Sequence, residues 1–303
     1  MNSIRKIPFP KEFAAKCLSW GRRLFIPVAL GFLVYSAYRA GDHLAPLLGA
    51  VSPRYLLLAW VCWFAAQWVG PLGSLAVMRI LNLPLGYREL ALISVLRLPA
   101  KYLPGGIWQS VARFAAYRRL EVSKADSLFI LVAEHLIAVC VSAALGASVL
   151  LHIEGIAFLH GVIACVLIGA LALLAVTALW ILRTQGCTKK NLAGILMAIL
   201  AAALFWTFAG ASFCAYWAAA FGLQGSGVLR IASCYLLSWS AGFVALFAPQ
   251  GIGVFEWVAS HLLTSAWPVS VTVIAAASFR IVTMAGDLSA WAAGVAISRF
   301  RET

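Results

Sequence analysis

"KYLPGGIWQ", residues 101 to 109, interrupts a largely apolar stretch that extends from about residue 88 to residue 117. Proline removes a backbone donor and clashes with the preceding helical turn, and glycine favours conformations that a helix does not use. Lys101 adds a charge that a lipid-facing helix rarely carries. The stretch therefore predicts a helix break inside a membrane-like region.

The composition of the whole chain is that of an integral membrane protein. Of its 303 residues, 63% are hydrophobic and 11% are charged, against about a quarter charged in soluble domains. A bilayer core needs about 20 helical residues to cross it, and apolar runs lie at about 24–40, 55–78, 127–151, 158–182, 192–221 and 271–297. We expect an all-α polytopic protein with one transmembrane domain at 24–298, a basic cytoplasmic segment at 1–23 and a cytoplasmic tail at 299–303.

The cysteine pattern and the N-terminal sequence argue against disulfides, a metal site and a cleaved signal peptide. The seven cysteines form no C-x-x-C pair and most lie in apolar runs, so neither a disulfide framework nor a metal site is expected. The basic N-terminus before the first apolar run resembles a secretory signal, but no convincing A-x-A site follows. We therefore expect an uncleaved first span.

A second broken region, about 231 to 264, contains "APQGIGVFE" at residues 248 to 256. At an offset of 145, the shared residues are Pro104, Gly106 and Ile107 with Pro249, Gly251 and Ile252, and His135 falls on Arg280. Three crossings separate the breaks, which predicts two inverted repeats, about 24–151 and 158–297. Each repeat then has about three spanning helices and one broken re-entrant-like hairpin, as in many transporters. The alternative is a chance match, or tight turns between fully crossing helices.

The charged loops give the chain an orientation. Seventeen Lys and Arg residues fall on one side: Arg5, Lys6, Lys11, Lys16, Arg22, Arg23, Arg79, Arg88, Arg113, Arg118, Arg119, Lys124, Arg183, Lys189, Lys190, Arg299 and Arg301. On the other side lie Arg39, Arg54 and Arg230. The positive-inside rule then predicts that both termini are cytoplasmic. This distribution also explains the net charge of +13 without nucleic acid as a partner.

Six charged residues fall in the apolar regions: Arg97, Lys101, Arg280, Glu134, Glu256 and Asp287. Each would cost about 2.5 to 3.5 kcal/mol at a lipid-exposed helix centre, so they must face one another or a hydrated cavity. Arg97 and Lys101 are four residues apart, which predicts a shared helix face directed toward the break. Amides freed at the breaks, approached closely through glycine, suit a phosphate or another anionic headgroup.

The predicted substrate-binding set combines these cations with the break residues. Its members are Arg97, Lys101, Pro104, Gly105, Gly106, Trp108, Pro249, Gly251, Gly253, Glu256 and Arg280. Glu134, His135 and Asp287 are candidates for a proton or charge relay. The alternative interpretation is that the embedded charges form ion pairs that only hold helices together. No catalytic residue, metal ligand or cofactor is predicted.

"KYLPGGIWQSVAR", the Glu134-His135 pair and "APQGIGVFE" together resemble the lysylphosphatidylglycerol synthase transmembrane-region family, which includes the flippase half of the multiple peptide resistance factor. The resemblance covers about residues 20 to 298. By position, Pro104, Gly105 and Gly106 match the first family motif, Pro249, Gly251, Gly253 and Glu256 match the second, and Glu134 matches a family acid. Gln250 replaces the usual glycine and His135 the usual arginine. Because the second change removes a permanent cation, the headgroup preference of relatives does not transfer.

The resemblance implies a lipid flippase in the bacterial cytoplasmic membrane, acting on an anionic, aminoacylated or polyprenyl-linked lipid. It implies no aminoacyltransferase, because that activity resides in a soluble domain of the fused members. The chain has no G-x-x-x-x-G-K-[ST] loop, so transport would be downhill or proton-coupled. One alternative is a non-transporting accessory subunit of a lipid-modifying or glycosyltransferase enzyme. An intramembrane enzyme acting on lipid phosphates is less well supported, because no metal cluster or paired catalytic carboxylates are evident.

Overall fold

The computed structural model describes residues 51–102, 107–152, 159–222, 227–245, 248–263 and 268–299, and every regular element in these ranges is a helix. In chain order the elements are α2 (Pro53–Val69), α3 (Pro71–Ile80), α4 (Tyr87–Val95), η1 (Leu98–Tyr102), α5 (Trp108–Arg119), α6 (Lys124–Leu150), α7 (His160–Gln185), α8 (Lys189–Phe221), α9 (Val228–Val244), η3 (Pro249–Gly251), α10 (Val254–Leu263) and α11 (Val269–Arg299). The expected first span at 24–40 and the residues Pro104, Gly105 and Gly106 lie outside the described residues.

Five of these segments are long and apolar enough to cross a membrane: Pro53–Ile80, Lys124–Leu150, His160–Gln185, Lys189–Phe221 and Val269–Arg299. At about 1.5 Å per residue, each exceeds the roughly 30 Å of a bilayer core. They confirm the five predicted spans that fall in the described residues. The protein is therefore a multi-pass membrane protein.

The spans extend a few residues beyond the apolar runs because polar caps begin them. The Ser123 hydroxyl accepts a hydrogen bond from the backbone N–H of Asp126 at the start of α6. Thr188 does the same for Asn191 at the start of α8. Such caps satisfy amide groups that have no partner within the helix. The first described span differs, because Pro71 divides it into α2 and α3.

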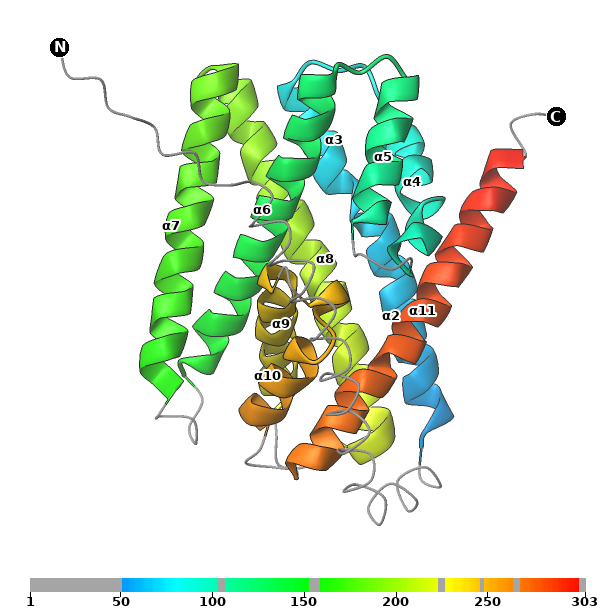
Figure 1. The fold of residues 1–303 in the computed structure, drawn as a ribbon, viewed down its shortest axis with the longest axis vertical. Coiled ribbons are helices and arrows are strands. Elements are labelled where there is room, and N and C mark those ends of the chain that lie inside the picture. The colour runs from blue at the N-terminus through cyan, green and yellow to red at the C-terminus, as the bar shows by residue number, and fades with distance from the viewer. Residues whose placement is uncertain are drawn as a thin grey trace, which may run out of the picture.

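Both predicted breaks are present as pairs of short helices. α4 and η1 precede the first break and α5 follows it, whereas α9 and η3 precede α10 at the second. In Figure 1, α4 and α5 occupy the upper half of the bundle, and α9 and α10 occupy the lower half. The helices of the two broken regions therefore lie in opposite halves of the bundle (Figure 1).

Cations gather at one end of the bundle. The end that holds the α5–α6 and α7–α8 connections (Figure 1, top) carries Arg79, Arg88, Arg118, Arg119, Lys124, Arg183, Lys189, Lys190 and Arg299. Within the described ranges, the opposite end carries Arg54 and Arg230. Arg113 is an exception to the predicted distribution, because it lies inside α5 with a side chain that is only 12% exposed.

Candidate functional site

The Asp287 carboxylate, on α11, is the centre of a buried polar cluster beside the first break. It forms an ion pair with Lys101 of η1 and accepts hydrogen bonds from the Tyr102 hydroxyl at 2.6 Å and the Trp63 indole at 2.8 Å. Its side chain is 1% exposed, whereas that of Lys101 is 24% exposed. The ammonium group also lies 5.5 Å from the centre of the Trp63 ring. Two hydrogen-bond donors and one counter-charge offset the cost of burying this carboxylate.

A small residue lets Trp63 reach this cluster. Gly286, next to Asp287, packs directly on Trp63, and a Cβ there would lie 2.7 Å from the indole ring. Real Cβ contacts are almost never that close, so a larger residue would displace the tryptophan. Trp63 therefore joins α2 to α11 at the level of the ion pair.

A second ion pair lies beside the second break. Nε of Arg280 in α11 donates to Oε1 of Glu256 at 2.9 Å, and Nη2 forms an ion pair with the same oxygen at 2.9 Å. Glu256 lies in the first turn of α10, and its Oε2 accepts from the backbone N–H of Gly253 at 2.6 Å. The carboxylate is 0% exposed and the arginine side chain is 34% exposed. The anion is therefore enclosed while part of the cation remains accessible.

Backbone amides at the second break are already occupied. The N–H of Gly253 donates to Glu256, and the N–H of Gly251 donates to the carbonyl of Ala248 at 2.9 Å. The sequence predicts that such amides receive an anionic headgroup. In this conformation Glu256 itself supplies the anion at the start of α10, so the amides of Gly251 and Gly253 are not available to a headgroup.

Gln250 connects the two breaks. Its side-chain Nε2 donates to the backbone carbonyl of Lys101, and its own carbonyl accepts from Nη1 of Arg280 at 3.4 Å. Gln250 has a φ of 53° and Gly251 a φ of 67°. A Cβ on Gly251 would lie 2.7 Å from Cα of Gly242, so the break and α9 touch through two glycines. The cations Lys101 and Arg280 thus flank one junction between the halves of the chain.

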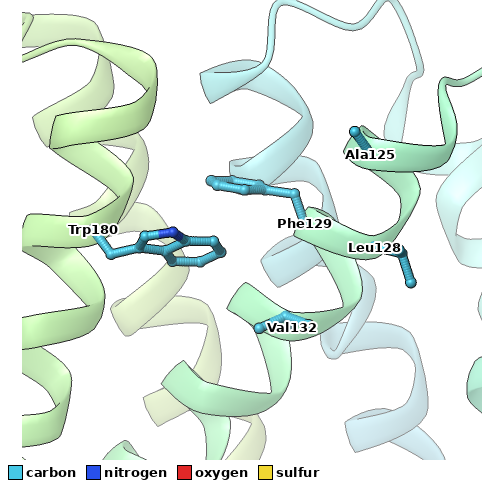
Figure 2. A pocket seen from close by; sticks show the side chains of 5 residues that line it. All are labelled: Ala125, Leu128, Phe129, Val132 and Trp180. Carbon is cyan, nitrogen blue, oxygen red and sulfur yellow. The ribbon is translucent and has the colours of Figure 1, made fainter. Parts of the chain in front are cut away.

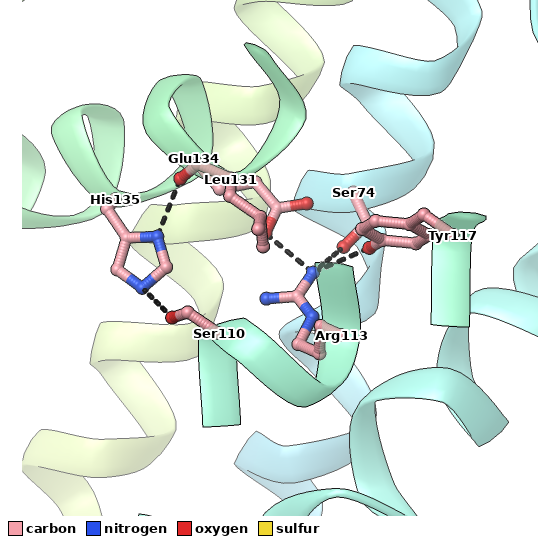
Figure 3. Close-up of polar contacts among 7 residues, drawn as sticks. All are labelled: Ser74, Ser110, Arg113, Tyr117, Leu131, Glu134 and His135. Carbon is pink, nitrogen blue, oxygen red and sulfur yellow. Dashed lines mark hydrogen bonds and ion pairs between the residues drawn. The ribbon is translucent and has the colours of Figure 1, made fainter. Parts of the chain in front are cut away.

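A third ion pair lies between α5 and α6 (Figure 3). Nη2 of Arg113 donates to Glu134 Oε2 at 2.7 Å, to the Tyr117 hydroxyl at 2.8 Å and to the Ser74 hydroxyl at 2.9 Å. Both charged side chains are 12% exposed. Within the described residues, Nε of Arg113 and Oε1 of Glu134 have no hydrogen-bond partner. This pair is enclosed on both sides.

His135 points away from Glu134, as adjacent residues on a helix do (Figure 3). Its Nδ1 lies 2.6 Å from the Leu131 carbonyl and its Nε2 lies 3.5 Å from the Ser110 hydroxyl. The ring stacks on Phe243 of α9 with centroids 5.7 Å apart. His135 therefore contacts α5 and α9 and belongs to a different cluster from Glu134.

Arg97 does not join the cluster around Lys101. The predicted shared helix face is wrong, because α4 ends at Val95 and η1 is a separate 3-10 helix. Nη1 of Arg97 instead turns back to the carbonyls of Ile93 and Leu92, at 3.2 and 3.5 Å. Trp108, also in the predicted set, begins α5 and is 44% exposed.

Several residues of the site are absent from the sequence-based set: Trp63, Tyr102, Gln250, Arg113, Tyr117 and Ser74. Arg113 had a detectable signal, because it interrupts an amphipathic helix at a position that a membrane would enclose. Gln250 was noticed only as a departure from a glycine. Trp63 and Ser74 had none, because only the fold brings α2 and α3 beside these charges.

Within the described residues, no three His, Cys, Asp or Glu side chains lie together as metal ligands would. No known protein-family model matches this chain, and no curated protein matches it. The three ion pairs and the junction between the two breaks are the features of the described residues that point to a function.

Proposed function

We propose that the protein is a flippase that moves an anionic, aminoacylated or polyprenyl-linked phospholipid across the cytoplasmic membrane. The observation that carries the proposal is the asymmetry of exposure at the junction between the breaks. Lys101 and Arg280 are 24% and 34% exposed, whereas their partners Asp287 and Glu256 are 1% and 0% exposed. A phosphate can approach the cations from the side that the carboxylates do not occupy.

Both cations retain donors for such a ligand. A guanidinium has five N–H groups and an ammonium has three. In the described contacts, Arg280 donates from Nε to Glu256 and from Nη1 to the Gln250 carbonyl, and Lys101 pairs with Asp287. Charge-assisted bonds to phosphate are among the strongest hydrogen bonds in proteins. The lipid tails would remain in the bilayer while the headgroup passes the junction.

An inverted repeat supports alternating access in this proposal. α11 begins at Val269, 145 residues after Lys124, where α6 begins, which is the same offset as between the Pro-x-Gly-Ile motifs. α6 packs on α8 and α9, and α11 packs on α2 and α4, which is the exchange of partners that the proposed inverted repeat would give. The two halves would then rock around the junction and expose it to each side in turn.

The orientation follows from the charged end of the bundle. In the positive-inside rule, loops rich in Lys and Arg remain in the cytoplasm. We therefore place the end with Lys124, Arg183 and Arg299 on the cytoplasmic side. Asp287 and Glu134 are the carboxylates that a proton-coupled version of the mechanism would use, and downhill transport would need neither.

A proteoliposome assay with fluorescent anionic phospholipids tests the proposal. We expect the wild-type protein to translocate lipid faster than empty liposomes, and Lys101→Ala to reduce translocation to the empty-liposome rate. Asp287 keeps donors from Tyr102 and Trp63 in this variant but loses its counter-charge, so circular dichroism must show that the variant is folded and rates are compared per folded protein. Lys189→Ala, at an exposed position that begins α8, is the matched control and should retain the wild-type rate.

Two results would contradict the proposal. Wild-type protein that is no faster than empty liposomes for any anionic lipid would remove the transport function. A Lys101→Ala protein with full activity would remove the junction as the site.

A second candidate function is a non-transporting accessory subunit of a lipid-modifying or glycosyltransferase enzyme. The observation that favours it is that Glu134, Glu256 and Asp287 each already have a cationic partner, as helix-holding ion pairs would. In that case liposome assays would show no transport, and the protein would copurify stably with an enzyme.

A further inference from the structure

We propose that the groove between the cytoplasmic ends of α6 and α7 binds one anionic phospholipid of the surrounding bilayer, at a site separate from the junction. The groove has a volume of about 240 Å³ and an entirely apolar lining (Figure 2): Ala125, Leu128, Phe129, Val132 and Trp180. It faces outward from the bundle, because Leu128 and Val132 are each 47% exposed. The proposal does not depend on the transport function.

The shape of the groove suits part of one acyl chain. The Trp180 indole extends from α7 toward α6 (Figure 2), and its ring lies 4.5 Å from the Phe129 ring between centroids. These rings form the floor and one wall of the groove. From Ala125 to Val132 the helix rises about 10 Å, so a chain can lie along α6 for that distance.

Cations stand at the end of the groove where a headgroup would lie. Lys124 directly precedes Ala125, and Arg183 follows Trp180 by three residues, which places it on the same side of α7. Both are exposed and have no carboxylate partner in the described part of the chain. Two acids lie near Lys124 in the sequence, Glu121 and Asp126, and Asp126 accepts from the Ser123 hydroxyl at 2.6 Å.

The position along the membrane agrees with this assignment. Trp180 lies five residues before Gln185, where α7 ends, so it is about 8 Å from the end of the helix. Tryptophan is enriched at this headgroup level of membranes. A lipid whose chain contacts Trp180 thus has its phosphate near Lys124 and Arg183. Two cations favour phosphatidylglycerol over phosphatidylcholine, and each basic residue near the surface contributes about fivefold.

Photo-crosslinking of the whole protein in phosphatidylcholine vesicles tests the site. The probes are phosphatidylglycerol and phosphatidylcholine that each carry a diazirine on one acyl chain, and mass spectrometry maps the labelled peptides. We expect phosphatidylglycerol to label the 124–132 and 176–183 segments about 25-fold more than phosphatidylcholine does, which is about fivefold for each of the two cations. The α8 face at Leu196, Leu200 and Leu204 is also exposed to lipid and should show no such preference.

Two double variants distinguish a specific lipid site from a general effect of positive charge at this end of the bundle. Lys124→Gln with Arg183→Gln should lower groove labelling by phosphatidylglycerol to the phosphatidylcholine level. Arg88→Gln with Arg299→Gln removes two charges at the same end of the bundle and should leave groove labelling unchanged. Equal labelling by both probes, equal preference on the α8 face, or equal losses in the two double variants would each overturn the proposal.

Discussion

Two ion pairs tie a short helix to the span that follows it, and they differ in sign and in enclosure. Arg113 of α5 pairs with Glu134 of α6, whereas Glu256 of α10 pairs with Arg280 of α11. In the first pair both side chains are 12% exposed; in the second the carboxylate is 0% exposed and the arginine 34% exposed. The first pair encloses both of its charges, whereas the second leaves part of its cation accessible, as the proposed headgroup site requires.

The surroundings of the two arginines sharpen the contrast. Arg113 is bonded through Nη2 to side chains of α3, α5 and α6, so it joins three helices. Arg280 is bonded to Glu256 and to the backbone of Gln250, which leaves one side of the guanidinium accessible. The first arginine is fixed by neighbours on three helices, and the second is 34% exposed, which leaves room for the proposed headgroup.

The largest effect should come from breaking the enclosed pair. Glu134→Ala leaves the Arg113 charge buried with only hydroxyl acceptors, and removing one partner of a buried pair costs about 3 to 5 kcal/mol. Glu256→Ala leaves a partly exposed Arg280 and removes a helix cap, so its cost should be about 1 to 2 kcal/mol. Thermal and denaturant unfolding in detergent micelles measure both.

A double variant controls for the charge itself. Arg113→Met with Glu134→Leu replaces the pair by apolar side chains and should recover most of the stability lost in Glu134→Ala. If Glu134→Ala and Glu256→Ala lower the free energy of unfolding by the same amount, the difference in exposure between the two pairs does not affect stability.

A smaller effect should follow from replacing each arginine by lysine, which keeps the charge but removes the planar fork. Arg280→Lys should slow lipid translocation by about tenfold, because losing one charge-assisted hydrogen bond to a phosphate costs about 1.5 kcal/mol. Arg113→Lys should lower the unfolding temperature and leave the translocation rate per folded protein near that of the wild type. If instead Arg113→Lys slows translocation and Arg280→Lys only lowers the unfolding temperature, the ligand binds at the α5–α6 pair.

Much of the fold could be read from local chemistry, whereas the pairing of charges could not. Apolar runs and Pro-x-Gly motifs predict the spans and breaks because each depends on a few neighbouring residues. Which carboxylate meets Lys101 depends on how α11 crosses η1, and its partner is Asp287, 186 positions away along the chain. The expected proximity of Arg97 and Lys101 failed for a local reason, since the chain leaves the α-helix after Val95. Long-range packing and the early end of α4 are therefore the reasons why the charge pairs could not be predicted from the sequence.

The smallest predicted effect concerns Gln250, which joins the open pair to the first break. Gln250→Ala removes its side-chain bond to the Lys101 carbonyl and retains a backbone φ of 53°, so we expect a loss of about 1 kcal/mol. Gln250→Gly loses the same bond but relieves the left-handed backbone, a gain of about 1 kcal/mol. Glycine should therefore be close to wild type in stability and more stable than alanine, as measured by thermal unfolding.

The two Gln250 variants also distinguish the effect of the backbone conformation at residue 250 on transport from the effect of the side-chain bond to Lys101. Both lack the link between the breaks, so both should change the translocation rate in the same direction if that link holds the junction together. Should only Gln250→Ala differ from the wild type, the backbone conformation at the second break matters and the bond to Lys101 does not. In that case the open pair would be coupled to the first break through Asp287 and Lys101 alone, and Arg280 would act within its own half of the molecule.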